Sequence, residues 1–451
     1  MQHEVDVAVV GAGSAGVAAA VAAAEHGASV LLIEASGAVG GTLAWQLLEH
    51  SAGFHDLHGR QVVSGFGQRL VNRLAAAGSS PGHVRDDVGY TATRTPVNHV
   101  ELALAEAVML QEAGAELWLY ARLAKALVER GRVTEVVVQT PSGHRIVRPR
   151  VVVDASGDAV LARLAGAAMH RDAAGERQPA SLTFKLGGVA FTTLLAYARD
   201  NPDDFHAGSR FGDAADEHVN LWGFGRLLAR GHQSGHLSLR RSELHLAGWP
   251  LRGEAVVNVT RIGAGTQDIP WEGGAVMALS RQVLEFAAWF RQLVPGCANA
   301  YVAAVADRVG VRESARVVGH ATLTRKDVLD GARFADAIAL GAFPIDVHSS
   351  ASAGLSHTEQ LGEAFEIPYG CLVPKGLVNM LVAGRCISST HEANGSVRIT
   401  ASCFATGEAA GTAAAICVRS GVHADELDVT ALQCALKDRG AILRPAPGFV
   451  A

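Results

Sequence analysis

Short apolar runs and a helix of small residues alternate at the start of the chain. Residues 5–10 (VDVAVV) are mostly β-branched, the pattern of a parallel strand that is buried on both faces. An alanine-rich segment at 14–26 predicts a helix closed by Gly27, and the apolar run SVLLIE then ends at Glu34. This order predicts a strand–helix–strand unit at the start of an α/β fold.

Strand and helix patterns return in two later parts of the chain. A hairpin is predicted with strands near 133–139 and 145–148, and the strand VVVDASGD follows at 151–158. Near the end, residues 379–385 (NMLVAGR) have the pattern of another buried strand, and a small-residue helix follows near 399–418. Both ends of the chain therefore contribute to the predicted α/β fold.

The segment between these parts, residues 166–365, has a different character. Alternating stretches such as SLTFKL and EAVVNVT predict antiparallel strands, and helical patterns lie near 191–200 and 275–293. We therefore expect a discontinuous domain formed by residues 1–165 and 366–451. The inserted segment is expected to form a substrate domain with a mixed sheet and helices.

Composition narrows the class of protein. The 451 residues are 49% hydrophobic with a net charge of −5, which excludes a largely disordered chain. Since 39 Lys and Arg face 44 Asp and Glu without a basic run, nucleic acid is not expected as a main partner. The six Cys include no Cys-x-x-Cys pair, which argues against a zinc ribbon or a dithiol redox pair. We expect a reduced, cytoplasmic protein without a metal site.

One apolar stretch imitates a membrane span. The 18 residues from Val7 to Ala24 carry no charge, and this stretch is just long enough for a membrane-spanning helix. Gly11, Gly13 and Gly16 interrupt the stretch, and the flank MQHEVD is acidic, whereas a signal peptide has a positive flank. We expect the stretch to be buried inside a soluble fold, with no membrane span.

The same glycines have the spacing of a dinucleotide-binding loop. Gly11, Gly13 and Gly16 form G-x-G-x-x-G between the predicted strand and helix. Gly11 permits a tight turn, Gly13 leaves room for a pyrophosphate, and Gly16 lets helix and strand pack closely. Glu34 ends the second strand, where a carboxylate accepts hydrogen bonds from a ribose and repels a 2′-phosphate. NAD or FAD is the predicted ligand of this unit.

Further motifs resemble those of FAD-dependent oxidoreductases of the glutathione-reductase-like class. They are VVVDASGD (151–158), GVRESARVVGHATLTRKDV (310–328), FPIDVHSS (343–350), the segment 367–398 and the helix sequence ATGEAAGTAAA. More narrowly, the chain is similar to a bacterial FAD-dependent oxidoreductase family distantly related to fumarate reductase flavoproteins. The resemblance implies FAD as cofactor and an α/β fold: a Rossmann-like, glutathione-reductase-type domain with an inserted mixed-sheet α+β substrate domain.

The resemblance also implies which residues hold FAD. The pyrophosphate would lie against Gly11, Gly13, Ser14, Ala15 and Gly16. Glu34 would hold the adenosine ribose, Gly41 and Thr42 would approach the flavin or its ribityl chain, and Arg122 and Leu123 would border the adenine. Two strand ends would complete the site, with Ala155, Gly157 and Asp158 on one and Gly384 and Arg385 on the other. Many relatives have an acidic residue in place of Arg385, which weakens a ribityl-hydroxyl role for this side chain.

Two histidines are candidates for proton transfer. His348 follows Asp346 by two residues, so both side chains project from one face of an extended segment and can form an acid–base pair. The alternative is a purely structural Asp–His hydrogen bond. His391 lies in the loop before the C-terminal helix, where relatives place residues over the flavin.

Arginines near these histidines are candidates for holding negative charge. Arg312 and Arg316 lie four residues apart, on one face if the segment is helical, where they would clamp a carboxylate. The alternative is pairing with Glu313 or other acids. Arg398 would stabilise a reduced flavin or an anionic substrate, with Asn394 and Ser396 as nearby hydrogen-bond donors.

These residues predict an FAD-dependent oxidoreductase that transfers a hydride between flavin and a small polar or anionic organic molecule. No second complete G-x-G-x-x-G unit occurs, so a separate NADPH domain is not expected, and quinone, oxygen or a partner protein is open as the second redox partner. A flavin-dependent non-redox lyase or isomerase is the main alternative. A tRNA-modifying flavoprotein is disfavoured because the chain is net acidic. The oligomeric state is open.

Overall fold

A computed structural model describes residues 2–170, 177–263, 269–348, 357–359 and 361–444. Its main sheet has seven strands, and its centre is parallel: β1 pairs with β2 and β9, β2 with β6, and β19 with β9. The antiparallel pairs β7–β8 and β8–β9 make this sheet mixed. The strands are β1 (Gln2–Val10), β2 (Val30–Ile33), β6 (Glu116–Trp118), β7 (Arg122–Glu129), β8 (Arg132–Thr140), β9 (Gly143–Asp154) and β19 (Met380–Val382).

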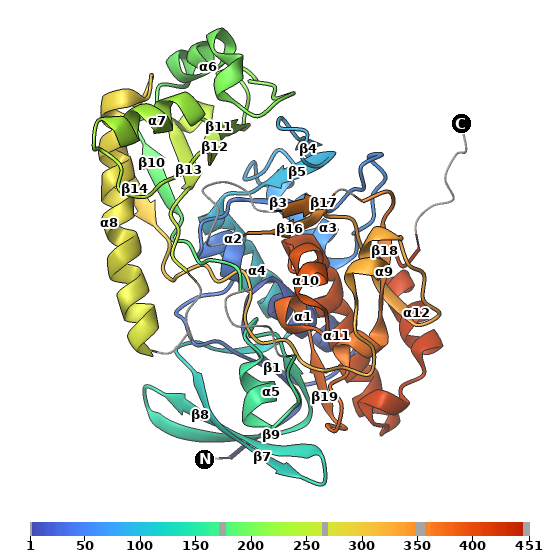
Figure 1. Ribbon diagram of the computed structural model, residues 1–451. Helices are drawn as coiled ribbons and strands as arrows, with labels where there is room; N and C mark the ends of the chain where they lie inside the picture. The colour runs from blue at the N-terminus through green and yellow to red at the C-terminus, as the bar shows by residue number, and fades with distance from the viewer. Residues whose placement is uncertain (1, 171–176, 264–268, 349–356, 360, 445–451) are drawn as a thin grey trace.

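Two helices from opposite ends of the chain pack together beside this sheet (Figure 1). They are α1 (Ser14–Glu25) and α11 (Thr400–Ser420). A Cβ at Gly407 or Gly411 would overlap the carbonyl oxygens of Ala15 or Ala19, so only glycine allows this close approach. The α11 helix is long and apolar enough to cross a membrane, yet 94% of its most apolar window is buried inside the molecule, as in a core helix.

A second sheet lies in the inserted segment. Its order is β11–β12–β13–β10–β14, and every pair is antiparallel, as the alternating patterns predict. The strands are β10 (Phe184–Gly187), β11 (Val219–Gly223), β12 (Leu244–Trp249), β13 (Glu254–Asn258) and β14 (Tyr301–Val305). Figure 1 shows the long helix α8 (Ile269–Leu293) alongside this sheet, with α6 (Phe191–Asp200) and α7 (Gly225–Gln233) above it.

Shorter elements surround the two sheets. The strands are β3 (His50–Ala52), β4 (Val84–Arg85), β5 (Thr93–Pro96), β15 (Ala337–Gly341), β16 (Ile345–Val347), β17 (His357–Glu359) and β18 (Phe365–Pro368). The helices are α2 (Gly41–Ala44), α3 (Phe66–Ala76), α4 (His99–Ala113), α5 (Val160–Leu164), α9 (Arg325–Leu329), α10 (His391–Val397) and α12 (Val429–Asp438).

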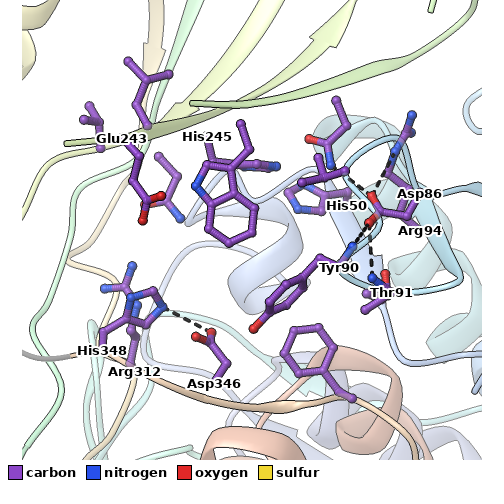
Figure 2. A pocket seen from close by; sticks show the side chains of 18 of the residues that line it. His50, Asp86, Tyr90, Thr91, Arg94, Glu243, His245, Arg312, Asp346 and His348 are labelled. Atoms are coloured by element: carbon purple, nitrogen blue, oxygen red, sulfur yellow. Dashed lines mark hydrogen bonds and ion pairs between the residues drawn. The ribbon is translucent and has the colours of Figure 1, made fainter. Parts of the chain in front are cut away.

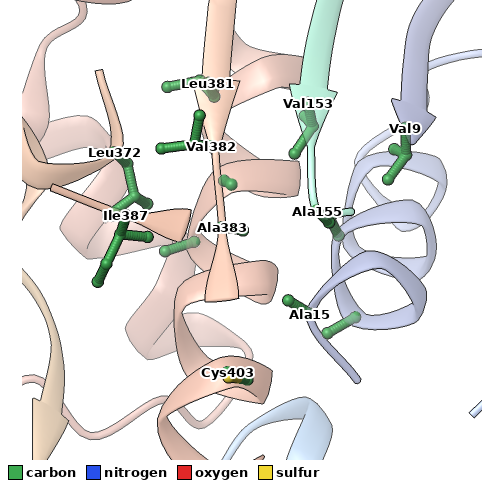
Figure 3. Packing of buried hydrophobic residues seen from close by; sticks show 14 of the residues in the cluster. Val9, Ala15, Val153, Ala155, Leu372, Leu381, Val382, Ala383, Ile387 and Cys403 are labelled. Atoms are coloured by element: carbon green, nitrogen blue, oxygen red, sulfur yellow. The ribbon is translucent and has the colours of Figure 1, made fainter. Parts of the chain in front are cut away.

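Buried hydrophobic residues form two cores, and their limits differ from the predicted domain boundary. One core joins strands and helices from both chain ends, and Figure 3 shows Val9, Val153 and Val382 of three neighbouring strands within it. The other extends from Ala180 to Val309, with Leu47 added. Residues of the predicted inserted domain from Val317 to Phe365 pack in the first core, because β15 pairs with β18 and packs against α11. The sequence predicted the α/β fold and its Rossmann-like unit correctly.

Candidate active site

A cleft of about 680 Å³ opens at the carboxyl ends of the parallel strands, with walls from both cores. Of the predicted FAD residues, those that line it are Gly11, Gly13, Ser14, Ala15, Glu34, Gly41, Thr42, Arg122, Ala155, Gly157, Asp158, Gly384 and Arg385. Gly16 and Leu123 are not part of its wall. A Cβ at Gly16 would overlap the Gly11 carbonyl oxygen, so this glycine serves the close packing of α1 on β1.

The glycine loop fits a pyrophosphate. Gly11 has φ +92° and Gly41 has φ +48°, conformations that favour glycine. A Cβ at Gly41 would lie 2.7 Å from the Gly13 Cα, so two loops meet with bare backbone at the cleft. Gly13 is the N-cap of α1 and offers no side-chain cap, and the first turn holds no acidic residue, which leaves backbone N–H groups for an anion. The cleft therefore has the size and the donors that FAD requires.

Side chains at the two ends of the cleft are held by ion pairs and backbone donors. Glu34 accepts hydrogen bonds from the backbone N–H groups of Ala12 and Ser36, both at 2.7 Å, which fixes its carboxylate. Across the cleft, Arg385 donates to Asp158 at 2.7 Å and to Ser314 at 2.9 Å. This pair joins the two strand ends that the sequence assigned to the cofactor, and the Arg385 charge is matched within the wall.

A second cavity, of about 170 Å³, adjoins the cleft. Residues that line both spaces are His50, Ala52, Asn258, Arg312, Phe343, Asp346 and His348. Figure 2 shows this cavity, with Tyr90 reaching into it between His50 on one side and Asp346 and His348 on the other. Any molecule in the small cavity thus lies beside a ligand of the large cleft.

Asp346 and His348 form the pair that their spacing predicted. Asp346 lies on β16 and His348 follows the strand, so both side chains point to one side, and His348 Nε2 lies 3.2 Å from Asp346 Oδ2. Arg398 Nη2 also donates to Asp346 Oδ2 at 3.2 Å. Burial favours a raised pKa for Asp346, but His348 and the guanidiniums of Arg398 and Arg312 outweigh it and lower that pKa to about 2.

The same surroundings keep His348 neutral. Burial, opposed by Asp346 and reinforced by Arg312, lowers the pKa of His348 to about 4. Arg261 Nη2 lies 3.3 Å from His348 Nδ1. Because a guanidinium only donates, Nδ1 accepts, which places the ring proton on Nε2 toward Asp346.

Arg312 and Arg316 point to different places, because their segment is not helical. Arg312 lines both cavities and donates from Nη1 to the Pro179 carbonyl oxygen and to Ser181 Oγ, both at 2.7 Å. Burial and then neighbouring arginines lower the pKa of Arg312 to about 9. Arg316 instead forms a buried ion pair with Glu313. The predicted two-arginine clamp is therefore incorrect, whereas the alternative pairing of Arg316 with Glu313 is confirmed.

His391 lies outside the walls of both cavities. Thr390 caps α10 by accepting from the Ala393 N–H, which places His391 in the first turn. Its Nδ1 is hydrogen-bonded to Glu313 Oε1 at 2.9 Å, and this hydrogen bond raises the pKa of His391 despite partial burial. Asn394 and Ser396 bond to backbone carbonyls of Arg385 and Phe343. These contacts fix α10 in place next to the cleft, and His391, Asn394 and Ser396 line neither cavity.

Several residues that line the small cavity belong to none of the sequence motifs described above. His50 comes from β3, Tyr90 from the loop before β5, Trp222 from β11 and His245 from β12. Arg241 is another, and its Nε and Nη1 are buried without a hydrogen-bond partner among the described residues. Only folding brings these residues together, and no local spacing connects them.

Part of the chain is similar in sequence to two curated reductases. Digeranylgeranylglycerophospholipid reductase 1 of Methanopyrus kandleri is 35% identical over 167 residues, which are 36% of this chain and 42% of that protein. Reductase 2 of the same organism is 34% identical over 170 residues, 36% of this chain and 40% of that protein. The chain thus matches about two fifths of the length of these curated relatives.

Solved structures resemble the whole chain at low identity. A geranylgeranyl bacteriochlorophyll reductase-like protein from Thermoplasma acidophilum is 14% identical with a TM-score of 0.49, covering 98% of this chain and 85% of that one. A p-nitrophenol 4-monooxygenase from Pseudomonas putida is 10% identical with a TM-score of 0.49, covering 97% and 85%. The family described as FAD dependent oxidoreductase matches residues 6–436. Since that match spans nearly the entire chain, the protein belongs to the family of FAD-dependent oxidoreductases.

Proposed function

We propose that this FAD-dependent oxidoreductase transfers a hydride between the flavin and a small polar or anionic organic substrate held in the 170 Å³ cavity. The observation that supports this most is the shared wall: Arg312, Asp346 and His348 line both the cofactor cleft and the small cavity. FAD, when bound, supplies the hydride chemistry, and the protein supplies orientation, charge stabilisation and proton transfer.

Each shared side chain has a defined task in this proposal. Arg312 is fixed by Pro179 and Ser181 and presents positive charge to an anionic substrate. His348 exchanges a proton at Nδ1 once the 3.3 Å hydrogen bond that Arg261 donates to this atom is released, while Asp346 holds the ring by its Nε2–H. Arg398 is bound to Asp346 at the cleft side and stabilises negative charge there.

The relatives' names bear on the direction of the reaction and on the substrate. Reduction is the direction that the two Methanopyrus kandleri reductases are named for. A cavity of 170 Å³ is close to the ~150 Å³ that takes one benzene molecule, so it does not enclose a digeranylgeranyl lipid. The distant similarity to fumarate reductase flavoproteins stays a prediction from the motifs.

Anaerobic stopped-flow absorbance of the FAD-bound protein tests the proposal. Panels of hydroxy acids, amines and unsaturated acids are mixed with oxidised and with chemically reduced enzyme. At least one class should bleach or restore the flavin band, and Arg312→Met should slow that change by ~10²–10³-fold. Arg73→Ala, which removes an exposed ion pair with Glu112, is the control and should react normally. Turnover without any flavin redox change would support the lyase or isomerase alternative, and an equal rate in Arg312→Met would exclude its role.

A further inference from the structure

The small cavity has an apolar wall made of rings. Tyr90 lies edge-to-face against Trp222, with centroids 5.4 Å apart, and against Phe343 at 5.6 Å. His206 stacks on Trp222 at 5.1 Å and an interplanar angle of 22°, which holds the indole plane. Aromatic faces and edges arranged in this way favour another flat ring as neighbour.

A second wall carries more positive charge than its carboxylates balance. Arg241, Arg261 and Arg312 line it together with the carboxylates of Glu243 and Asp346. Three guanidiniums therefore meet two carboxylates, which repels amines and attracts an anion.

Arg241 supplies the binding group at this wall. Its side chain is 9% exposed, and its Nε and Nη1 are buried with no hydrogen-bond partner among the described residues. Unpaired buried donors are costly, and a carboxylate oxygen accepts a strong, charge-assisted hydrogen bond from a guanidinium N–H. These N–H groups are therefore available to a carboxylate in the cavity.

We infer that the substrate is an aromatic carboxylate of one ring, with its ring among Tyr90, Trp222 and Phe343 and its carboxylate on Arg241. This inference rests on the proposed function and deepens it by naming the substrate class. The cavity volume of about 170 Å³ fits this size, since one benzene molecule fills a cavity of ~150 Å³. An aliphatic dicarboxylate would leave the aromatic wall facing its second charge.

Ligand binding to the oxidised, FAD-bound protein tests this directly. Calorimetry and the flavin absorbance shift are recorded with benzoate, benzamide, cyclohexanecarboxylate and succinate. Benzoate should bind at least about tenfold more tightly than each of the other three, because only it offers both the flat ring and the charge. Equal or tighter binding of benzamide or succinate would overturn the inference, and so would equal binding of cyclohexanecarboxylate.

Variants then locate the carboxylate. Arg241→Met should weaken benzoate by about 10- to 100-fold, since a hydrogen bond to a charged group is lost. Arg240→Met changes the exposed neighbouring arginine and should bind as the wild type does. Unchanged affinity in Arg241→Met would contradict the assignment. If Arg241→Met does not fold, the four-ligand comparison on the wild type still decides.

Binding and redox failures are distinguishable. Tight benzoate binding with no flavin reduction by any compound would refute the proposed function and leave this inference standing. Hydride transfer with an aliphatic anion, together with absent benzoate binding, would refute this inference alone.

Discussion

The cofactor cleft and the small cavity are neighbours built on opposite principles. The cleft is made largely of backbone: Gly11, Gly13 and Gly41 leave bare main chain around the start of α1. The cavity is made of large side chains from six strands and several loops, including Tyr90, Trp222 and Arg312. A backbone-built site depends on a short contiguous motif, whereas a site built from side chains depends on where distant segments meet.

The largest expected effect contrasts Gly13 and Gly16 of the glycine loop. A Cβ at Gly13 would meet only the Gly41 Cα, at 3.8 Å, so Gly13→Val should fold but lose FAD, since its side chain enters the cofactor space. Gly16→Val should fail to fold, because its side chain would overlap the Gly11 carbonyl oxygen. Flavin content and circular dichroism of both variants measure the difference. Full flavin occupancy in Gly13→Val would refute the cofactor assignment.

The next effect contrasts Arg398, which lines the cofactor cleft, with His391, which lines neither space. Arg398→Ala should keep FAD but slow flavin reduction by ~10²–10³-fold, because charge stabilisation at the cleft is lost. His391→Ala should react at nearly the wild-type rate but lose about 1–3 kcal/mol of unfolding free energy, since its hydrogen bond to the buried Glu313 disappears. Stopped-flow reduction and thermal unfolding compare them. A slow His391→Ala with normal stability would return His391 to the active site.

The smallest expected effect concerns pH and again contrasts the two regions. In the cavity, burial lowers the pKa of His245 well below its usual value, so the native state excludes a proton that the unfolded chain binds below about pH 6.5. The contribution of the neutral His245 to the free energy of unfolding is complete above pH 6.5 and is lost as the pH falls below that value. The stability advantage of wild type over His245→Gln should therefore shrink by about 1 kcal/mol between pH 7 and 5.5.

Glu106 lies beside Gly40, next to the cofactor loop, and gives the free energy of unfolding a pH dependence of the opposite sign. Burial raises its pKa to about 8, so the native state holds a proton that the unfolded chain has already released. Its contribution is therefore lost progressively as the pH rises from about 4.5 to 8, and the advantage of wild type over Glu106→Gln should shrink over that range and level off above it. Thermal unfolding across pH 5–9 measures both differences. Two pH-independent differences would contradict these protonation states.

The sequence alone determined the nucleotide-binding unit and the part of the cleft that this unit lines. The strand, glycine loop, helix and Glu34 lie within one short stretch, so local backbone rules are enough to place them. The extended segment around Asp346 also fixed its pairing with His348, because alternate residues of a strand share a face.

Only the tertiary structure decided the rest. The motif at 310–328 places Arg312 in the cavity and Arg316 on Glu313 because that segment is irregular, not helical. Val317 and the buried residues after it pack in the first core because β15 pairs with β18. The aromatic wall and Arg241 come from strands and loops whose meeting is set by the packing of two cores, which no local pattern encodes.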